Sequence, residues 1–368
     1  MRVSLFARVD HNIQPYIFLF KQSLERQGLV VHGEREFGLK WLLTKGKSCD
    51  AIHLHWIEAA YEPAKQNIRS RWLKRLMNNR LTRPLRGALR LTDFSAAFFL
   101  AKLQGKVVIY TVHNLTAHRK EPRFFAALNR IAQRIVLTRA HRIHVHNHYS
   151  RQYLETVYKR QQGVHVVPLG NYIGHYPNDI SRSEARQQLD LPDDAFVYLF
   201  LGMIRPYKGV EELIHAFEKL DLPACRLLIV GRVSRASHKV LSLGQNNSAI
   251  KLVPEFVPDE ALQLYMNACD VFVLPYKKVT TSSAAVLSWS FGRPIVAPAM
   301  TSFPEFTTPG VGILYDPSRP TALVSALQQA REQSWSESEI FAHAHLFDWD
   351  KLAPQLANLY QTRPDEQQ

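Results

Sequence analysis

Two cations follow an apolar run near the middle of the chain. The run 198–201 ends at Gly202, Arg205 and Lys208 come next, and apolar residues at helical spacing begin at Val210. A strand, a glycine turn and a helix in this order predict an α/β unit whose loop opens at the carboxyl end of the strand. Helix amides and fixed cations at such a loop favour a diphosphate. We interpret Arg205 and Lys208 as a diphosphate clamp; the alternative is a solvated basic turn.

Two further groups in the same half could contact phosphate oxygens. Gly231 and Arg232 close the predicted strand 226–230, and four hydroxyl residues stand at the start of a predicted helix: Thr280, Thr281, Ser282 and Ser283. Hydroxyls and free amides at a helix start suit a phosphate. The simpler interpretation is that one hydroxyl caps the helix, and both can hold together.

Polar side chains also follow the predicted strands of the amino-terminal half. His113 ends the strand 107–112, and we prefer a ligand-contacting role for it over a structural one. Four residues are candidates for a general base, and three for acceptor binding. The general-base candidates are Asp10, His11, Glu58 and Glu121, and of these Asp10 and Glu58 are kept as catalytic candidates. The acceptor-binding candidates are His11, Asn12 and His118.

Composition predicts a two-domain protein. The 368 residues exceed one ordinary core, and 46% hydrophobic with 21% charged residues is typical of soluble globular proteins. Apolar strands alternate with helices, so we expect an α/β protein of two doubly wound domains. We place them at 1–175 and 176–350, because the segment 173–194 is polar and contains prolines. Residues 351–368 are expected to form a helix crossing back to the first domain, followed by a disordered tail.

The net charge of +14 is concentrated in the segment 65–102, which contains ten basic residues and one acidic residue, Asp93. Leucines interleave with these cations, which suits either a helix on an anionic membrane or a helix packed on its own domain. Nucleic acid is not expected, because no stacking ladder or known motif accompanies the charge. With neither a signal peptide nor a run long enough to span a bilayer, we expect a cytoplasmic protein, peripheral to the inner face of the cytoplasmic membrane.

Cysteine and histidine spacing does not predict a metal site. Cys49, Cys225 and Cys269 form no C-x-x-C pair and are interpreted as buried thiols. The pairs His53/His55 and His144/His146 each share one face of a predicted strand, but no acidic or cysteine ligand accompanies them at the usual spacing.

Several motifs in order resemble one family. They are FLGMIRPYKGVEELIHAF, LLIVGR, FVPDEALQLYMNACDVFVLPY, TTSSAAVLSWSFGRPIVAP, FPEF and GVGILYDP, with TVHNL and HVVPLGNY in the amino half. Together they resemble the GT-B nucleotide-sugar glycosyltransferases, in particular glycosyltransferase family four (group 1) and its bacterial polysaccharide-assembly relatives. The resemblance implies a carboxyl-terminal domain that binds the donor and an amino-terminal domain that receives the acceptor.

The resemblance carries over to some residues and fails at others. Lys208 falls on the family's clamp lysine, Glu305 on its late acidic position, and His113 on a histidine near the transferred sugar. Met203 occupies the position of the family's clamp arginine, and Arg205 lies two residues further along the chain. The two family glutamates fall on Val279 and Leu287, so we leave retention or inversion open.

The expected activity is transfer of a hexose from a nucleoside-diphosphate sugar to a saccharide or polyprenyl-linked acceptor in bacterial surface or exopolysaccharide synthesis. Without a D-x-D motif, fixed cations would replace a metal ion, and no cofactor is expected. The alternative, favoured by the missing glutamates, is a noncatalytic protein that binds sugar nucleotides or polyanions. A phosphorylase-like reaction would need a pyridoxal-binding lysine context, which the sequence does not show. The sequence does not identify the donor base, the sugar or the acceptor.

Overall fold

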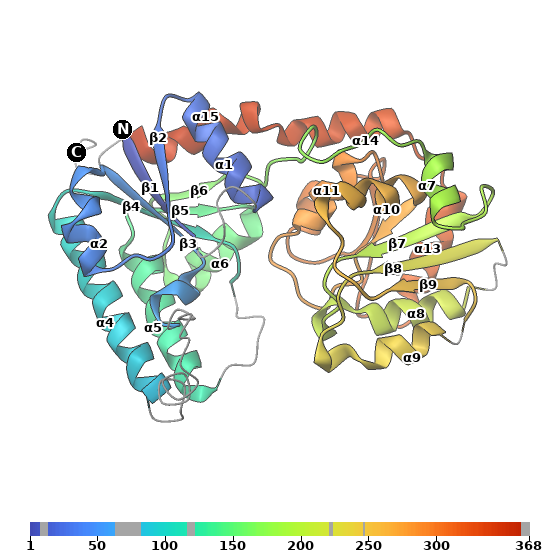
Figure 1. Ribbon diagram of the computed structural model, residues 1–368, viewed down its shortest axis with the longest axis horizontal. Coiled ribbons are helices and arrows are strands. Elements are labelled where there is room, and N and C mark those ends of the chain that lie inside the picture. The colour runs from blue at the N-terminus through green and yellow to red at the C-terminus, as the bar shows by residue number, and fades with distance from the viewer. Residues whose placement is uncertain (8–13, 63–81, 116–121, 221–223, 246, 362–368) are drawn as a thin grey trace. The chain divides into compact units, whose positions relative to one another are not determined.

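The computed structural model describes the chain except for residues 8–13, 63–81, 116–121, 221–223, 246 and 362–368. The chain divides into two compact units (Figure 1), unit 1 comprising Met1–Pro168 with Trp349–Gln368, and unit 2 comprising Leu169–Asp348. Each has its own sheet and its own covering helices. Among the described residues, no helix is long and apolar enough to cross a bilayer.

Unit 1 contains a parallel six-stranded sheet in the order β2-β1-β3-β4-β5-β6. The strands are β1 (Arg2–Phe6), β2 (Val30–Glu34), β3 (Ala51–His55), β4 (Val107–Val112), β5 (Arg142–Val145) and β6 (Val164–Val166). β3 and β4 are buried along their whole length. Most of their residues are apolar, as is typical of strands inside a parallel sheet.

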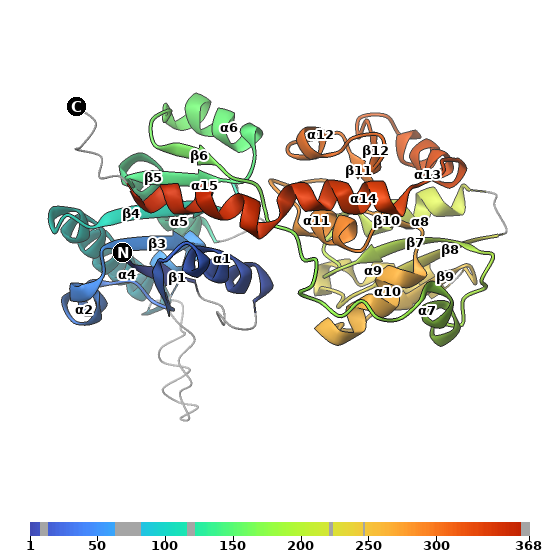
Figure 2. The same ribbon diagram turned by 90° about the horizontal axis from the view of Figure 1, so that it is seen from above.

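Helices cover both faces of this sheet. They are α1 (Pro15–Arg26), α2 (Leu39–Leu43), α4 (Thr82–Leu103), α5 (Arg123–Arg139), α6 (His148–Tyr158) and α15 (Trp349–Gln361), with short 3₁₀ turns η1 (Lys45–Ser48) and η2 (Ile57–Ala60). Residues of α2, α4 and α5, such as Phe94 and Phe98, share one core cluster with the strands. Figure 2 shows α15 lying beside α1, where Arg26 forms an ion pair with Asp350 at 2.7 Å.

Unit 2 contains a second parallel six-stranded sheet in the order β12-β11-β10-β7-β8-β9. The strands are β7 (Phe196–Leu201), β8 (Cys225–Val230), β9 (Ile250–Val253), β10 (Val271–Val273), β11 (Ile295–Pro298) and β12 (Gly312–Tyr315). Its helices are α7 (Arg182–Gln188), α8 (Val210–Glu218), α9 (Lys239–Gln245), α10 (Leu262–Ala268), α11 (Ser283–Ser290), α12 (Phe303–Phe306), α13 (Ala322–Glu332) and α14 (Glu337–Ala344). The 3₁₀ turns are η3 (Pro206–Lys208), η4 (Arg235–Ser237), η5 (Asp259–Ala261) and η6 (His345–Phe347).

The predicted fold class, two doubly wound α/β domains, is confirmed. The units divide after Pro168 rather than near 175. Asn171 explains the difference, since its backbone N–H donates to the carbonyl of Phe347 and its side chain to that of Ala344, both at 2.9 Å. These bonds tie residues after Pro168 to the end of unit 2.

The segment 173–194, which we expected to mark the domain boundary, lies within unit 2 and contains α7. Ser181 and Glu184 cap this helix reciprocally, with the Ser181 Oγ accepting from the Glu184 N–H at 3.2 Å. The S-x-x-E spacing that signals such a cap was present in the sequence.

All three cysteines are free and buried, as expected.

Candidate functional site

The clamp loop of unit 2 lies where the strand order reverses. β7 pairs with β8 on one side and with β10 on the other, although β8 and β9 come between β7 and β10 in the chain. In open parallel sheets, ligands bind at the carboxyl ends of the strands that flank such a reversal. The loops after β7 and β10 therefore form the natural ligand site of this unit.

Glycines allow the loop after β7 to approach its neighbours closely. Gly209 has φ +68°, and a Cβ atom there would overlap the carbonyl oxygen of Pro275, next to β10. Gly231 after β8 has φ +137°, and its Cβ would overlap the carbonyl oxygen of Gly202. Both positions therefore require glycine for conformation and for space.

Lys208 is held against an aromatic ring that comes from the loop after β10. Its Nζ lies 3.7 Å from the ring centroid of Tyr276, within cation–π range. Burial lowers the pKa of the Lys208 ammonium to about 8, and burial raises the pKa of the Tyr276 hydroxyl, so the ring stays neutral. Lys208 thus presents a charged but partly desolvated ammonium group at neutral pH.

The other predicted donor residues differ in their exposure and in their hydrogen bonds. Arg205 is partly exposed, with its Nε 3.0 Å from the Met203 sulfur, and Arg232 after β8 is exposed. Ser282 caps α11, its Oγ accepting from the Ala285 N–H at 3.3 Å, so the N-cap interpretation is confirmed.

The remaining hydroxyls of this group differ in burial. Thr280 is buried, Thr281 partly buried and Ser283 exposed. Glu305 is exposed on the short helix α12, after β11. Ligand contacts of these residues stay predictions.

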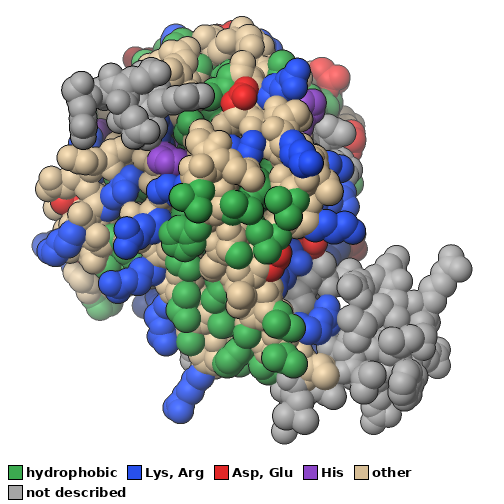
Figure 3. Space-filling model, turned by 90° about the vertical axis from the view of Figure 1, so that its left-hand side faces the viewer, with side chains coloured by type: hydrophobic (Ala, Val, Ile, Leu, Met, Phe, Trp, Pro, Cys, Tyr) green, Lys and Arg blue, Asp and Glu red, His purple; other side chains and the backbone are tan. Residues whose placement is uncertain are grey.

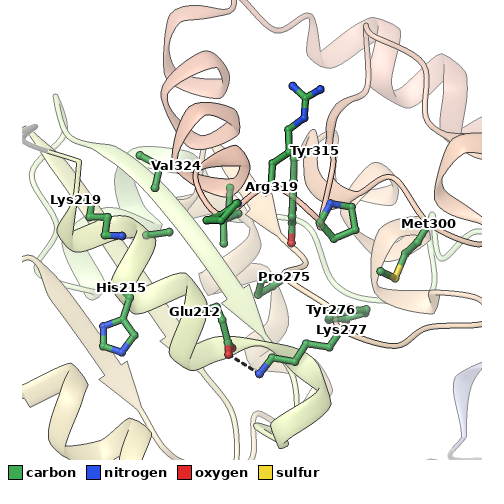
Figure 4. Close-up of a pocket in the computed structure, with 14 residues that line it drawn as sticks. Glu212, His215, Lys219, Pro275, Tyr276, Lys277, Met300, Tyr315, Arg319 and Val324 are labelled. Carbon is green, nitrogen blue, oxygen red and sulfur yellow. Dashed lines mark ion pairs between the residues drawn. The ribbon is translucent and has the colours of Figure 1, made fainter.

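A cavity of about 470 Å³ adjoins the clamp on the side of α8 and α13 (Figure 4). Tyr276 lines it and also contacts Lys208, and Glu212 of α8 forms an ion pair with Lys277 across its edge. The cavity and the clamp thus share one aromatic ring. The predicted donor-binding residues are not among its lining side chains.

In unit 1, His113 lies at the end of β4 beside β3. Its Nε2 is 2.9 Å from the Nδ1 of His55, and its ring stacks on Trp56 with centroids 4.4 Å apart at 11°. Burial, and then the neighbouring His55, lower the pKa of His113 well below the ordinary value. The imidazole is therefore neutral at physiological pH, and its burial makes it a weaker base than an exposed histidine.

A chain of buried side chains crosses the same strands, and the sequence did not predict it. Tyr360 Oη lies 2.5 Å from His53 Nδ1, His53 Nε2 lies 2.7 Å from Thr111 Oγ1, and Thr111 Oγ1 lies 3.0 Å from His144 Nδ1. His144 Nε2 donates to the carbonyl of Val167 at 2.9 Å. Because a carbonyl only accepts, one proton arrangement satisfies the chain when both histidines are neutral: each member donates to the next.

Burial also favours the neutral form of His53 and His144. It lowers the pKa of His144 to about 4 and that of His53 well below its ordinary value. The H-x-H pattern on β3 and again on β5, the strands on either side of β4, was the available signal for a shared buried network.

Of the other predicted residues, Glu58 lies on η2 after β3 and is partly buried. Asp10, His11, Asn12, His118 and Glu121 lie outside the described residues, as does most of the basic segment before α4. Within the described part of the chain, no cluster of three or more His, Cys, Asp or Glu residues could hold a metal ion.

Comparison with known proteins agrees with this architecture. Residues 181–343 match the family model for glycosyl transferases group 1. The chain is 27% identical over 289 residues to the GDP-mannose:glycolipid 4-beta-D-mannosyltransferase of Xanthomonas campestris pv. campestris, covering 76% of this chain and 70% of that protein. It is 28% identical over 199 residues to a D-inositol 3-phosphate glycosyltransferase of Streptosporangium roseum, covering 49% and 45%.

Solved structures share the fold over almost the full length. The Anabaena protein HepE in complex with UDP-glucose gives a TM-score of 0.72 at 17% identity, covering 97% of this chain and 98% of that one. Sucrose-phosphate synthase from Thermosynechococcus elongatus gives 0.70 at 18% identity, covering 98% of each chain. The chain is a glycosyltransferase with the GT-B fold, and its residues 181–343 match the group 1 family.

Proposed function

We propose that this enzyme transfers a hexose, mannose in the first instance, from a GDP-sugar to a lipid-linked saccharide in bacterial surface or exopolysaccharide synthesis. The observation that carries the proposal is the Lys208 ammonium held on Tyr276 at the strand-order reversal of unit 2. The choice of donor and acceptor is supported by the Xanthomonas relative, whose name specifies GDP-mannose and a glycolipid.

The chemistry requires neutralisation of the leaving diphosphate. When the bond between the sugar and the diphosphate breaks, negative charge grows on the phosphate oxygens, and a partly desolvated cation stabilises it more strongly than a hydrated one. Lys208 supplies such a charge, and Arg205 on the same loop supplies a second. The acceptor oxygen forms the new bond to the sugar and loses its proton, for which the Glu58 carboxylate is the proposed acceptor among the described residues.

The donor preference can be tested by thermal unfolding. We expect GDP and GDP-mannose to raise the melting temperature more than UDP- or ADP-sugars do, because binding to the folded state stabilises it by mass action. Transfer of radiolabel from GDP-mannose to a bacterial lipid extract then tests turnover. A larger shift with a UDP-sugar would contradict the donor assignment, and no shift with any nucleotide would contradict the clamp.

We also propose that the fixed cations act without a divalent metal ion. Transfer is then expected to proceed at an unchanged rate in excess EDTA, because Lys208 and Arg205 carry the charge that a metal would otherwise supply. The initial rate should be measured with and without chelator, followed by addition of magnesium. A loss that magnesium restores would contradict this proposal.

A further inference from the structure

The helix α4 has two apolar stripes, and one of them faces outward. Its inner stripe, including Leu91 and Phe98, joins the core of unit 1. Its outer stripe exposes Leu85 (61%), Leu89 (61%), Phe99 (44%) and Leu103 (84%). A helix on the surface of a soluble domain ordinarily buries one stripe and presents polar residues on the other.

The neighbouring helix α5 extends this exposed surface. Phe124 is 43% and Ile131 50% exposed, and α4 packs along α5. Figure 3, which views unit 1 from the side of α4, shows a continuous band of hydrophobic side chains bordered by Lys and Arg. We call these six residues on α4 and α5 the α4–α5 face. A contiguous apolar patch of this kind marks an interaction site.

The charge around the α4–α5 face has one sign. The two helices carry eight cations, Arg83, Arg86, Arg90, Lys102, Arg123, Arg130, Arg134 and Arg139, and one acid, Asp93. Arg90 forms an ion pair with Glu36, and the side chains of the four α5 arginines are exposed. Long basic side chains can lay their methylene stems along apolar surface while the charged ends reach anions.

We propose that the α4–α5 face enters the headgroup region of an anionic bilayer and holds the enzyme at the membrane. This inference rests on the proposed function, in which the acceptor is lipid-linked. Apolar side chains on one helix face with flanking cations are the features of helices that lie in a membrane interface. A second copy of the chain fits less well, because pairing two such faces would bring two sets of eight cations together.

Sedimentation with vesicles tests the proposal. The full chain should bind phosphatidylglycerol-containing vesicles at low salt and bind less as salt rises, because screening weakens the attraction. The Leu85→Ser/Leu89→Ser double variant should bind about tenfold more weakly, since two apolar contacts with the bilayer are lost.

The matched control is Leu346→Ser/Val157→Ser, which removes side chains that are 60% and 53% exposed elsewhere. Its vesicle binding should equal that of the unmodified protein. Arg130→Gln/Arg134→Gln should weaken binding to anionic vesicles while leaving the residual binding to neutral phosphatidylcholine vesicles unchanged.

The outcomes separate this inference from the proposed function. GDP should raise the melting temperature of the Leu85→Ser/Leu89→Ser variant as it does that of the unmodified protein, which shows that the variant is folded and its donor site intact. Absence of vesicle binding by the unmodified protein, or equal binding by the double variant, overturns the inference. So does a dimer in analytical ultracentrifugation that the double variant abolishes, because the occupant is then a second copy. Vesicle binding without any sugar transfer would overturn the proposed function alone.

Discussion

Lys208 differs from an ordinary surface lysine because its ammonium group lies on the Tyr276 ring. Replacing Lys208 with alanine should lower kcat by about tenfold to a thousandfold, the range for losing one group that stabilises transition-state charge. Arg205→Ala should have a smaller effect, since Arg205 is more weakly held. Initial rates at saturating donor measure both.

The matched control is Lys40→Ala, which removes an exposed lysine from α2 of unit 1. Its rate should stay close to that of the unmodified enzyme, because a surface charge outside the donor-binding unit contributes little. Equal rates for Lys208→Ala and Lys40→Ala would show that the clamp does not act in turnover.

The pKa of Lys208 also predicts a pH profile. With a pKa of about 8, the ammonium is charged below pH 8 and loses its proton as pH rises through that value. The value of kcat/KM, which reports ionisation of the free enzyme, should therefore fall on the alkaline side with a midpoint near 8. Lys208→Arg should abolish this fall, because a guanidinium stays protonated across this range. The same alkaline midpoint in Lys208→Arg would assign the ionisation to another group.

Among individual residues, the positions of those on a loop next to a strand could be predicted. Lys208 and Ser282 were identified from a glycine turn and from hydroxyls before an apolar helix, and both lie at the carboxyl edge of the sheet. Tyr276 was missed, because its contact with Lys208 joins loops about seventy residues apart. That contact follows from the pairing of β7 with β10, and sequence order does not give this pairing.

At the scale of elements, the close approach of the β7 and β10 loops depends on Gly209. Gly209→Ala should destabilise unit 2 by about 3 kcal/mol, because it adds an overlap with the Pro275 carbonyl to the strain of a positive φ. Gly174→Ala is the matched control in the same unit: φ is +73° and no atom lies within 4 Å of the added Cβ.

The control should cost about 1 kcal/mol from backbone strain alone. Urea unfolding of both variants, followed by intrinsic fluorescence, measures the difference. Equal destabilisation would mean that the loop shifts freely and that the approach to Pro275 is not required.

Strands were predicted more accurately than the contacts between them. The predicted strand 107–112 coincides with β4 and the apolar run 198–201 lies within β7, because strands buried in a parallel sheet are continuous apolar runs. The chain from Tyr360 to His144 could not be predicted from these runs. It depends on the register that pairs Thr111 with His144 and on α15 returning to unit 1.

At the scale of the whole molecule, acid should affect the two units differently. In unit 1, the folded pKa of His144 is about 4, below the ordinary value of 6.5, so the unfolded chain binds protons more readily between these values. Stability that is fully present above pH 6.5 is therefore lost as pH falls towards 4, at about 1.4 kcal/mol per unit of pKa difference. The pKa values of His53, His113 and His146 are lowered as well, which adds to the loss of stability in acid.

Because each unit has its own sheet and core, we expect two calorimetric transitions. Lowering the pH from 7 to 5 should lower the melting temperature of the unit 1 transition by several degrees and that of unit 2 by less, since the shifted histidines of unit 2, His175 and His343, are only partly buried. GDP should raise the unit 2 transition because the clamp belongs to that unit. Scanning calorimetry at both pH values, with and without GDP, separates the effects; a single transition that GDP and acid shift together would show that the two units unfold as one.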